Sequence, residues 1–481
     1  MNRRITLSLV VALAAMAMLA VGAAAVPAKY VFLFIGDGMA MPQIAAAEAY
    51  LGALASDAPT FSKLSFTQFP VAALTTTYAS DDFIPDSAAT ATAIASGRKT
   101  GDGIIGMDPS KTIPFTSIAE MADAAGMRVG IVSSVNLDHA TPACFYAHEP
   151  SRNSYYNIAM QMVDSGFDYF AGGMVRVDKT PAGQPTPHQA LAANGFTVVE
   201  TREGFDALGP GSLPVYACEN GFIKNSLIYA IDAEEAETGD ITLAEFTRKG
   251  IELLDNPNGF FMMVEGGKID WACHANDAGA SIQDTIAFDL AVQEAIAFYS
   301  LHPDETLIVV TGDHECGGMT IGFAGTGYDS AFELLAGQTV SFEWFNQFVL
   351  SPYKAATPAG TAKLADLEDE FALYFGLADF SDYERGLLEN AFAQTMLGAK
   401  ERATDAATYL LYGGYEPLTV SLTHILNNRA GLAWTSYSHT GIPLPTFAVG
   451  AGANMFGGYY DNTDIFHKLV QSMGLEGYAS L

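Results

Sequence analysis

Residues 30–38 read YVFLFIGDG, a continuous apolar run that meets an aspartate between two glycines. A short run with no polar interruption is typical of a strand that is buried on both faces, as in a parallel sheet. Ligands of α/β sheets bind just beyond the carboxyl ends of the strands, which is where Asp37 stands. Asp37 is therefore a candidate ligand-binding residue, and the alternative is an ordinary turn aspartate.

Similar apolar runs recur along the chain and alternate with helical patterns. The pattern predicts further strands at residues 71–78, 128–133, 167–170, 260–264, 307–310 and 446–449, and helices at 41–54, 115–125, 243–254, 278–300 and 464–473. Strands that alternate with helices imply an α/β fold, in which a mostly parallel central sheet is covered by helices on both faces as a three-layer sandwich.

Residues 323–433 differ in character from the rest of the chain. Acidic helical patterns dominate this part, at residues 361–375, 383–397, 406–412 and 418–427. We expect a mainly helical insertion that packs over the sheet.

The charge of the chain limits its partners. Its 481 residues include 54 acidic and 23 basic side chains, a net charge of −31. Such acidity argues against nucleic acid or an anionic membrane surface as a partner. An anionic substrate would need local positive charge, which bound metal ions can supply.

The N-terminus has the pattern of an export signal. Arg3 and Arg4 precede an apolar run at 7–21, and small residues at 21–25 offer a cleavage site. We expect a signal peptide at 1–25 and a periplasmic or secreted protein with no other membrane segment; an uncleaved anchor is the alternative. In an oxidising compartment the four cysteines, Cys144, Cys218, Cys273 and Cys316, could form one or two disulfides or stay buried as free thiols.

A serine stands before a run of small residues in PDSAAT, residues 85–90. Ser87 could expose its hydroxyl at the opening turn of a helix, where free backbone N–H groups bind anions such as phosphate. The alternative is that Asp86 or Ser87 only caps the helix.

Polar residues stand at or just past several apolar strands. They are Asp37, Thr141, Glu265, Asp270, His274, Asp313 and His314. Carboxylates that gather at one sheet edge would repel one another unless cations lie among them. Mixed imidazole and carboxylate ligands suit zinc, whereas an all-oxygen set suits magnesium.

The chain contains, in this order, the motifs Gly36-Asp37-Gly38, Asp86-Ser87-Ala88-Ala89, His139-Ala140-Thr141-Pro142, Val264-Glu265-Gly266, Asp270 with His274, Asp313-His314 and His439-Thr440-Gly441. In this combination and order they resemble the motifs of the alkaline phosphatase family. Together they span nearly all of residues 26–481, which the resemblance identifies as one catalytic domain that includes the helical insertion.

The resemblance implies two zinc ions, one magnesium ion and a phosphoserine intermediate on Ser87. The implied ligands are Asp270, His274 and His439 for one zinc, Asp37, Asp313 and His314 for a second zinc that also meets Ser87, and Asp37, Thr141 and Glu265 for magnesium. Arg152 matches the family's phosphate-gripping arginine, whose planar fork suits two phosphate oxygens.

His139 and Trp271 stand beside the third ion site, at positions where some family members have an aspartate and a lysine. These two residues change the charge around that site and leave its metal identity open. Zinc ions a few ångströms apart could clamp the entering and leaving oxygens of an in-line displacement.

The implied reaction is hydrolysis of phosphate monoesters with release of inorganic phosphate, by a homodimer. The sequence also allows two alternatives: a phosphodiesterase or sulfatase of the same superfamily, and an exported metal- or phosphate-binding protein without turnover.

Overall fold

The computed structural model describes residues 27–221, 225–233, 240–358, 360–397, 402 and 404–478. The export signal predicted at residues 1–25 lies outside these residues. Within them, no helix combines the length and the apolar character that crossing a membrane requires.

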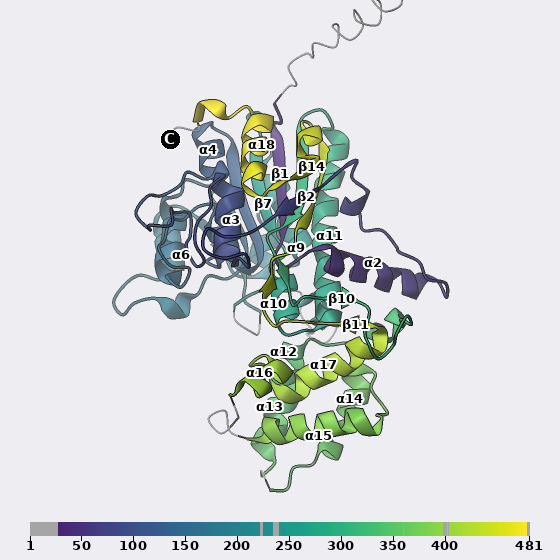
Figure 1. Ribbon diagram of the computed structural model, residues 1–481. Helices are drawn as coiled ribbons and strands as arrows, with labels where there is room; N and C mark the ends of the chain where they lie inside the picture. Colours follow the sequence, from purple (N-terminus) through teal and green to yellow (C-terminus); the bar gives the residue numbers. More distant parts are fainter. Residues whose placement is uncertain are drawn as a thin grey trace, which may run out of the picture.

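Ten strands of the described residues form one large sheet (Figure 1). In spatial order they are β14 (Gly458–Asp461), β2 (Val71–Thr76), β13 (Leu444–Gly450), β8 (Thr306–Gly312), β1 (Tyr30–Gly36), β7 (Phe260–Glu265), β3 (Arg128–Asn136), β4 (Tyr169–Gly173), β6 (Val215–Glu219) and β5 (Thr197–Val199). Only β13, among these, runs antiparallel to its neighbours. The predicted mostly parallel sheet is confirmed, and the short strands β5, β6 and β14 extend it beyond the prediction.

Strand β1 shows why the apolar runs are uninterrupted. Tyr30, Phe32 and Phe34 pack into the core on one face of the sheet, whereas Val31 and Leu33 pack into the core on the other face. Because side chains alternate across a strand, a strand buried on both faces needs apolar residues at every position.

Helices cover both faces of the sheet and complete the three layers. One core includes residues of α2 (Met41–Ala55), α8 (Arg202–Asp206), α9 (Leu243–Leu254), α10 (Lys268–His274) and α11 (Ala278–Leu301). The opposite core includes residues of α3 (Ser87–Ser96), α4 (Ile118–Ala124), α5 (Ala140–Ala143), α6 (Tyr155–Asp164), α7 (Pro187–Ala193) and α18 (Thr463–Met473).

The helix predicted at 115–125 begins later than expected. Ser117 is its N-cap, because its hydroxyl accepts a hydrogen bond from the backbone N–H of Glu120, whose side chain in turn accepts from the N–H of Ser117. This reciprocal capping box marks the first turn of α4.

The acidic segment is helical, as predicted, and its helices lie together below the sheet in Figure 1. They are α12 (Phe342–Phe345), α13 (Ser351–Ala356), α14 (Glu368–Phe375), α15 (Asp382–Met396), α16 (Ala406–Tyr412) and α17 (Pro417–Ala430). Helices α12 and α13 were not expected, and α14 begins seven residues after the predicted start at residue 361. Treating residues 323–433 as an insertion remains a prediction.

Candidate active site

Three central, neighbouring strands bring three carboxylates together at their carboxyl ends. Strands β8, β1 and β7 are adjacent and parallel, with Gly36 opposite Gly312 and Ile35 opposite Glu265. Asp37 and Asp313 each follow directly on the last residue of a strand, so they emerge beside Glu265. All three side chains are completely buried, which is costly for carboxylates unless they are paired, protonated or bound to a cation.

Two histidine rings face each other at a second point of the site. Nε2 of His274, at the end of α10, lies 3.1 Å from Nε2 of His439 in β12 (His439–Thr440). Each Nδ1 lies 2.7 Å from a backbone carbonyl oxygen, that of Tyr437 for His274 and that of Pro85 for His439. Because each Nδ1–H donates to its carbonyl, both Nε2 lone pairs point into the same space.

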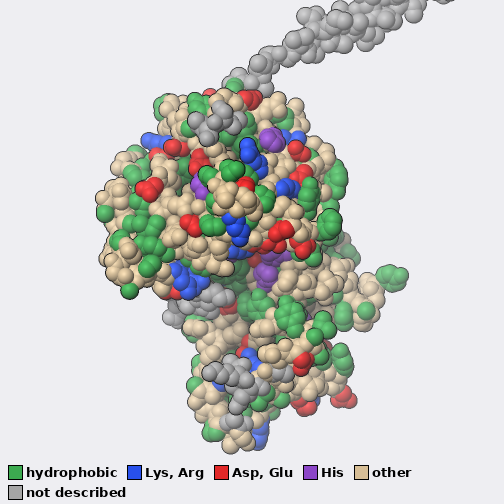
Figure 2. All heavy atoms as spheres, turned by 60° about the vertical axis from the view of Figure 1, so that its left-hand side comes forward, with side chains coloured by type: hydrophobic (Ala, Val, Ile, Leu, Met, Phe, Trp, Pro, Cys, Tyr) green, Lys and Arg blue, Asp and Glu red, His purple; other side chains and the backbone are tan. Residues whose placement is uncertain are grey.

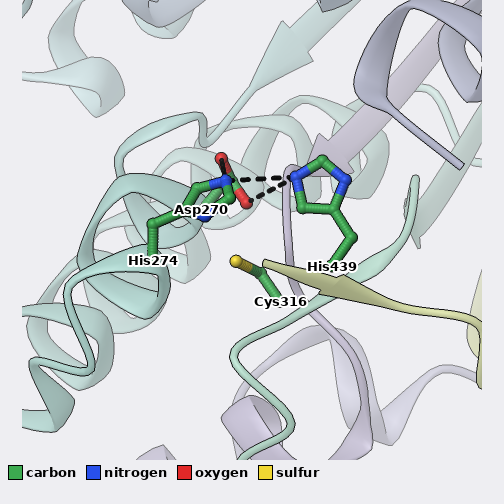
Figure 3. Close-up of side chains that lie close together, drawn as sticks. All are labelled: Asp270, His274, Cys316 and His439. Carbon is green, nitrogen blue, oxygen red and sulfur yellow. Dashed lines mark hydrogen bonds and ion pairs between the residues drawn. The ribbon is translucent and has the colours of Figure 1, made fainter. Parts of the chain in front are cut away.

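Asp270 adds oxygen atoms to the same space, as Figure 3 shows. Its Oδ2 lies 3.3 Å from Nε2 of His274, and its Oδ1 lies 3.6 Å from Nε2 of His439 while accepting no hydrogen bond. Only a proton or a cation can relieve the repulsion between two such nitrogens. This donor set fits Zn²⁺, which takes imidazole and carboxylate ligands.

A second donor group surrounds His314. Its Nε2 lies 3.4 Å from Oδ1 of Asp37, 3.2 Å from Oδ2 of Asp313 and 3.2 Å from the hydroxyl oxygen of Ser87. His314 is completely buried. The arrangement again fits a cation, because two carboxylates and an imidazole nitrogen converge on one point.

Ser87 is the first residue of helix α3, and Asp86 is its N-cap. Oδ1 of Asp86 accepts a hydrogen bond of 2.9 Å from the N–H of Ala89. The capping interpretation is therefore correct for Asp86 and leaves the Ser87 hydroxyl to face His314. Thr90, one turn on, donates to Oδ2 of Asp313 at 3.2 Å.

A third group of possible ligands consists of Asp37, Glu265 and His139, whose candidate atoms all lie within 4.8 Å of one another. Thr141 donates a hydrogen bond of 3.4 Å to Oδ2 of Asp37. Ser133 donates to Oε2 of Glu265, whereas Oε1 of Glu265 is buried with no hydrogen-bond partner.

Burial and mutual repulsion raise the pKa values of three carboxyl groups of the site. Burial first, and then repulsion from Asp313, raises the pKa of Asp37 well above its usual value. Burial raises the pKa of Glu265 to about 8 and that of Asp313 to about 7. Burial alone would lower the pKa of His274, but the Asp270 carboxylate raises it to about 9. Without cations, the site therefore holds extra protons at neutral pH.

Arg152 lies beside these groups with its guanidinium already engaged. One nitrogen donates to Oδ2 of Asp86 at 2.8 Å, and the other donates to Nε2 of His139 at 3.1 Å. Burial, with a further contribution from Arg152, lowers the pKa of His139 to about 3, so its ring is neutral and can accept. The ring of Trp271 meets that of His139 edge-on at 5.9 Å.

The predicted site residues thus lie close together. Figure 2 shows histidine and acidic side chains in a hollow between the broad body and the narrower helical part.

One nearby residue was not identified from the sequence as a possible ligand. Cys316, in β9 (Glu315–Cys316), places its thiol beside Asp270, His274 and His439. Its proximity to His314 in sequence was the only available signal. All four cysteines are buried free thiols.

A family model described as alkaline phosphatase matches residues 28–172 and 221–475. Alkaline phosphatase 3 of Bacillus subtilis (strain 168) is 30% identical over 460 residues, which covers 92% of this chain and 89% of that protein. Among solved structures, the cold-active alkaline phosphatase of Shewanella sp. has a TM-score of 0.76 and 29% identity, and the match covers 92% of this chain and 99% of that one. A histidine-to-glutamate mutant of the TAB5 alkaline phosphatase, with Mg bound in its M3 site, has a TM-score of 0.62 and 25% identity over 93% of this chain and 98% of that one.

Proposed function

This chain belongs to the alkaline phosphatase family, whose members are metal-dependent phosphatases, and we propose that it hydrolyses phosphate monoesters through a phosphoserine on Ser87. The observation that carries this proposal is the contact of the Ser87 hydroxyl with His314, 3.2 Å away in a buried cluster of metal-ligand side chains.

We assign the ions to the three donor groups. Asp270, His274 and His439 bind one zinc; Asp37, Asp313 and His314 bind a second; Asp37, Thr141 and Glu265 bind magnesium. The imidazole nitrogens of the first two ligand sets favour zinc, whereas the oxygens of Asp37, Thr141 and Glu265, with the ring of His139 left outside the set, favour magnesium.

When bound, the ions supply positive charge that offsets the buried carboxylates and stabilises the oxygens on either side of the transferred phosphorus. The chain's own residues supply the nucleophile and the orientation. Ser87 Oγ gives its proton to solvent and attacks the phosphorus, while the bond from phosphorus to the ester oxygen breaks and the departing alkoxide takes up a proton from solvent to become the alcohol. Water then cleaves the phosphoserine, which releases inorganic phosphate and restores the serine hydroxyl.

Arg152 orients the phosphate during both steps. Its fork can pair with two phosphate oxygens once it gives up its contact with His139 or Asp86. The backbone N–H groups at the start of α3 add further donors near the same oxygens. His139 and Trp271 shape the third site without binding its ion.

We also propose that the protein is exported to the periplasm or beyond after removal of residues 1–25, and that residues 26–481 act as a homodimeric enzyme. Its substrates are small phosphate monoesters.

The decisive test uses purified, metal-replete protein and p-nitrophenyl phosphate. We expect phosphate release that falls by at least about three orders of magnitude in Ser87→Ala, with metal content unchanged. Parallel assays with a phosphodiester and a sulfate ester separate this function from the related activities. A wild-type protein that leaves the monoester intact, or turns over a diester or sulfate faster, contradicts the proposal.

A further inference from the structure

A thiol shares the space of the facing histidine pair. The candidate ligand atoms of Asp270, His274, Cys316 and His439 all lie within 4.8 Å of one another. Figure 3 shows these four side chains close together, with the sulfur of Cys316 beside the rings of His274 and His439. Cys316 is completely buried.

Strand pairing fixes the direction of this thiol. Strands β9 and β12 are antiparallel, and Cys316 lies directly opposite His439. Side chains of directly opposed residues project from the same face of a strand pair. The cysteine sulfur is therefore aimed where the His439 ring is aimed.

The neighbouring carboxylate points elsewhere and is fully engaged. Oε1 of Glu315 accepts hydrogen bonds from Gln43 at 2.9 Å and from the N–H of Met319 at 3.1 Å, and Oε2 accepts from the N–H of Gly318 at 3.1 Å. Gln43 also donates to the carbonyl oxygen of Cys316 at 3.0 Å. These bonds hold β9 so that the thiol, and not the carboxylate, faces the histidines.

Asp270 gives an independent sign that a ligand belongs here. Its side chain is almost completely buried, it is aimed into the same space, and its Oδ1 accepts no hydrogen bond. A buried carboxylate oxygen in this condition is costly unless a cation binds it.

We propose that Cys316 is a fourth protein ligand of the metal ion held by Asp270, His274 and His439. The inference rests on the proposed metal centre and deepens it. On binding, the S–H bond breaks, its proton goes to solvent, and sulfur donates an electron pair to the ion. One thiolate and one carboxylate then balance the two positive charges of Zn²⁺, while the histidines stay neutral.

This ligand set has a chemical consequence. Catalytic zinc sites usually have three protein ligands and an open position, so with Cys316 as a fourth ligand a substrate oxygen would bind as a fifth. A fourth ligand that is soft makes this site more selective for zinc and cadmium than for magnesium or manganese.

Cobalt(II) tests the proposal, because a thiolate bound to cobalt produces a sulfur-to-metal charge-transfer band in the near ultraviolet. Full-length wild-type protein is stripped with a chelator under reducing conditions, reloaded with Co²⁺, and scanned. We expect the band in the wild type and in the control Cys218→Ser, whose thiol is also buried but lies in β6. We expect no band in Cys316→Ser or Cys316→Ala.

Zinc affinity gives a second readout. Competition with a chromophoric chelator should show that Cys316→Ser binds the zinc of this site at least about tenfold more weakly, since loss of even an outer partner costs about 10–100-fold. Cys218→Ser should match the wild type.

Three results would overturn the proposal: no band in cobalt-loaded wild type, a band that persists in Cys316→Ser, or a disulfide between Cys273 and Cys316 in the isolated protein. Failure of the proposed phosphatase function would give a different result from failure of the thiolate ligand. Cobalt- or zinc-loaded wild type that hydrolyses p-nitrophenyl phosphate without the band rejects only the thiolate ligand, whereas inactive, metal-free protein rejects the metal centre itself.

Discussion

Nε2 of His274 and Nε2 of His439 lie 3.1 Å apart although the Nδ1 of each ring is committed to a backbone carbonyl. Each carbonyl fixes a proton on Nδ1, so the two facing nitrogens need either a further proton or a cation between them. This arrangement suits a cation.

Removal of one member of this pair should empty one ion site. We expect His439→Ala to lose about one zinc per chain and at least about 100-fold in kcat, because the remaining ligands no longer fix the ion. Elemental analysis and phosphatase assays check both values. His467→Ala, on the exposed side of α18, is the matched control and should retain full metal content. Unchanged zinc in His439→Ala would contradict the assignment.

Replacing Arg152 by lysine should weaken phosphate recognition without removing the charge. Lysine cannot form the two parallel hydrogen bonds of the guanidinium fork. We expect kcat/KM to fall by about 10–100-fold, the effect of losing one hydrogen bond to a charged group, and inhibition by inorganic phosphate to weaken in parallel. Arg176→Lys, a substitution outside the site, should change neither value. Phosphate inhibition that is identical in Arg152→Lys and wild type would argue against the role.

Asp86 has two tasks that substitution can separate. Asp86→Ala removes the N-cap of α3 and should lower the free energy of unfolding by about 0.5–2 kcal/mol. Asparagine can still cap the helix but carries no charge to hold Arg152. Asp86→Asn should therefore be more stable than Asp86→Ala in chemical denaturation while showing altered KM, and it loses the hydrogen bond that Oδ2 accepts from the N–H of Gly103 at 2.9 Å. Equal destabilisation by both substitutions would show that the charge, rather than the cap, stabilises this turn.

The metal-free protein should lose stability as pH rises from about 6.5 to about 8. The pKa of Glu265 is raised to about 8, and that of Asp313 to about 7, so the folded state binds more protons than the unfolded state in this window. The raised pKa of His274, about 9, acts in the same direction, because its stabilising proton begins to leave.

The histidines with lowered pKa values, His314 and His439, do not reverse this fall of stability with rising pH. Burial lowers the pKa of His314 and of His439 to about 4, so their effect is complete once the pH exceeds the unfolded value of 6.5. Thermal unfolding of chelator-treated protein across the window measures the slope, and the remetallated protein is the control, with a flatter profile expected. A metal-free protein that becomes more stable toward pH 8 would refute the explanation.

Much of the fold follows from local patterns, as β1 shows. Its apolar residues face two cores, so the run of six is a direct consequence of burial on both faces. The short strands β5 and β14 have no such run, because they lie at the edges of the sheet where fewer side chains are buried. Helices α12 and α13 are only four and six residues long, too short for a period of 3.6 to stand out.

The candidate site was predictable where each residue follows a strand. Asp37, Glu265 and Asp313 were identified because the ends of neighbouring parallel strands must meet. Cys316 was missed because its position depends on pairing with His439, which is 123 residues away in the chain. Neither residue carries a local sign of that pairing, which only the folded chain supplies.

One carboxylate belongs to two of the ion clusters. Oδ1 of Asp37 faces His314, whereas its Oδ2 accepts the hydrogen bond from Thr141 and borders Glu265. An ion that binds either oxygen orients the other, so the second ion meets a ligand that no longer rotates. The ions proposed for these two clusters should therefore load cooperatively, so that loss of one ion on dilution promotes loss of the other.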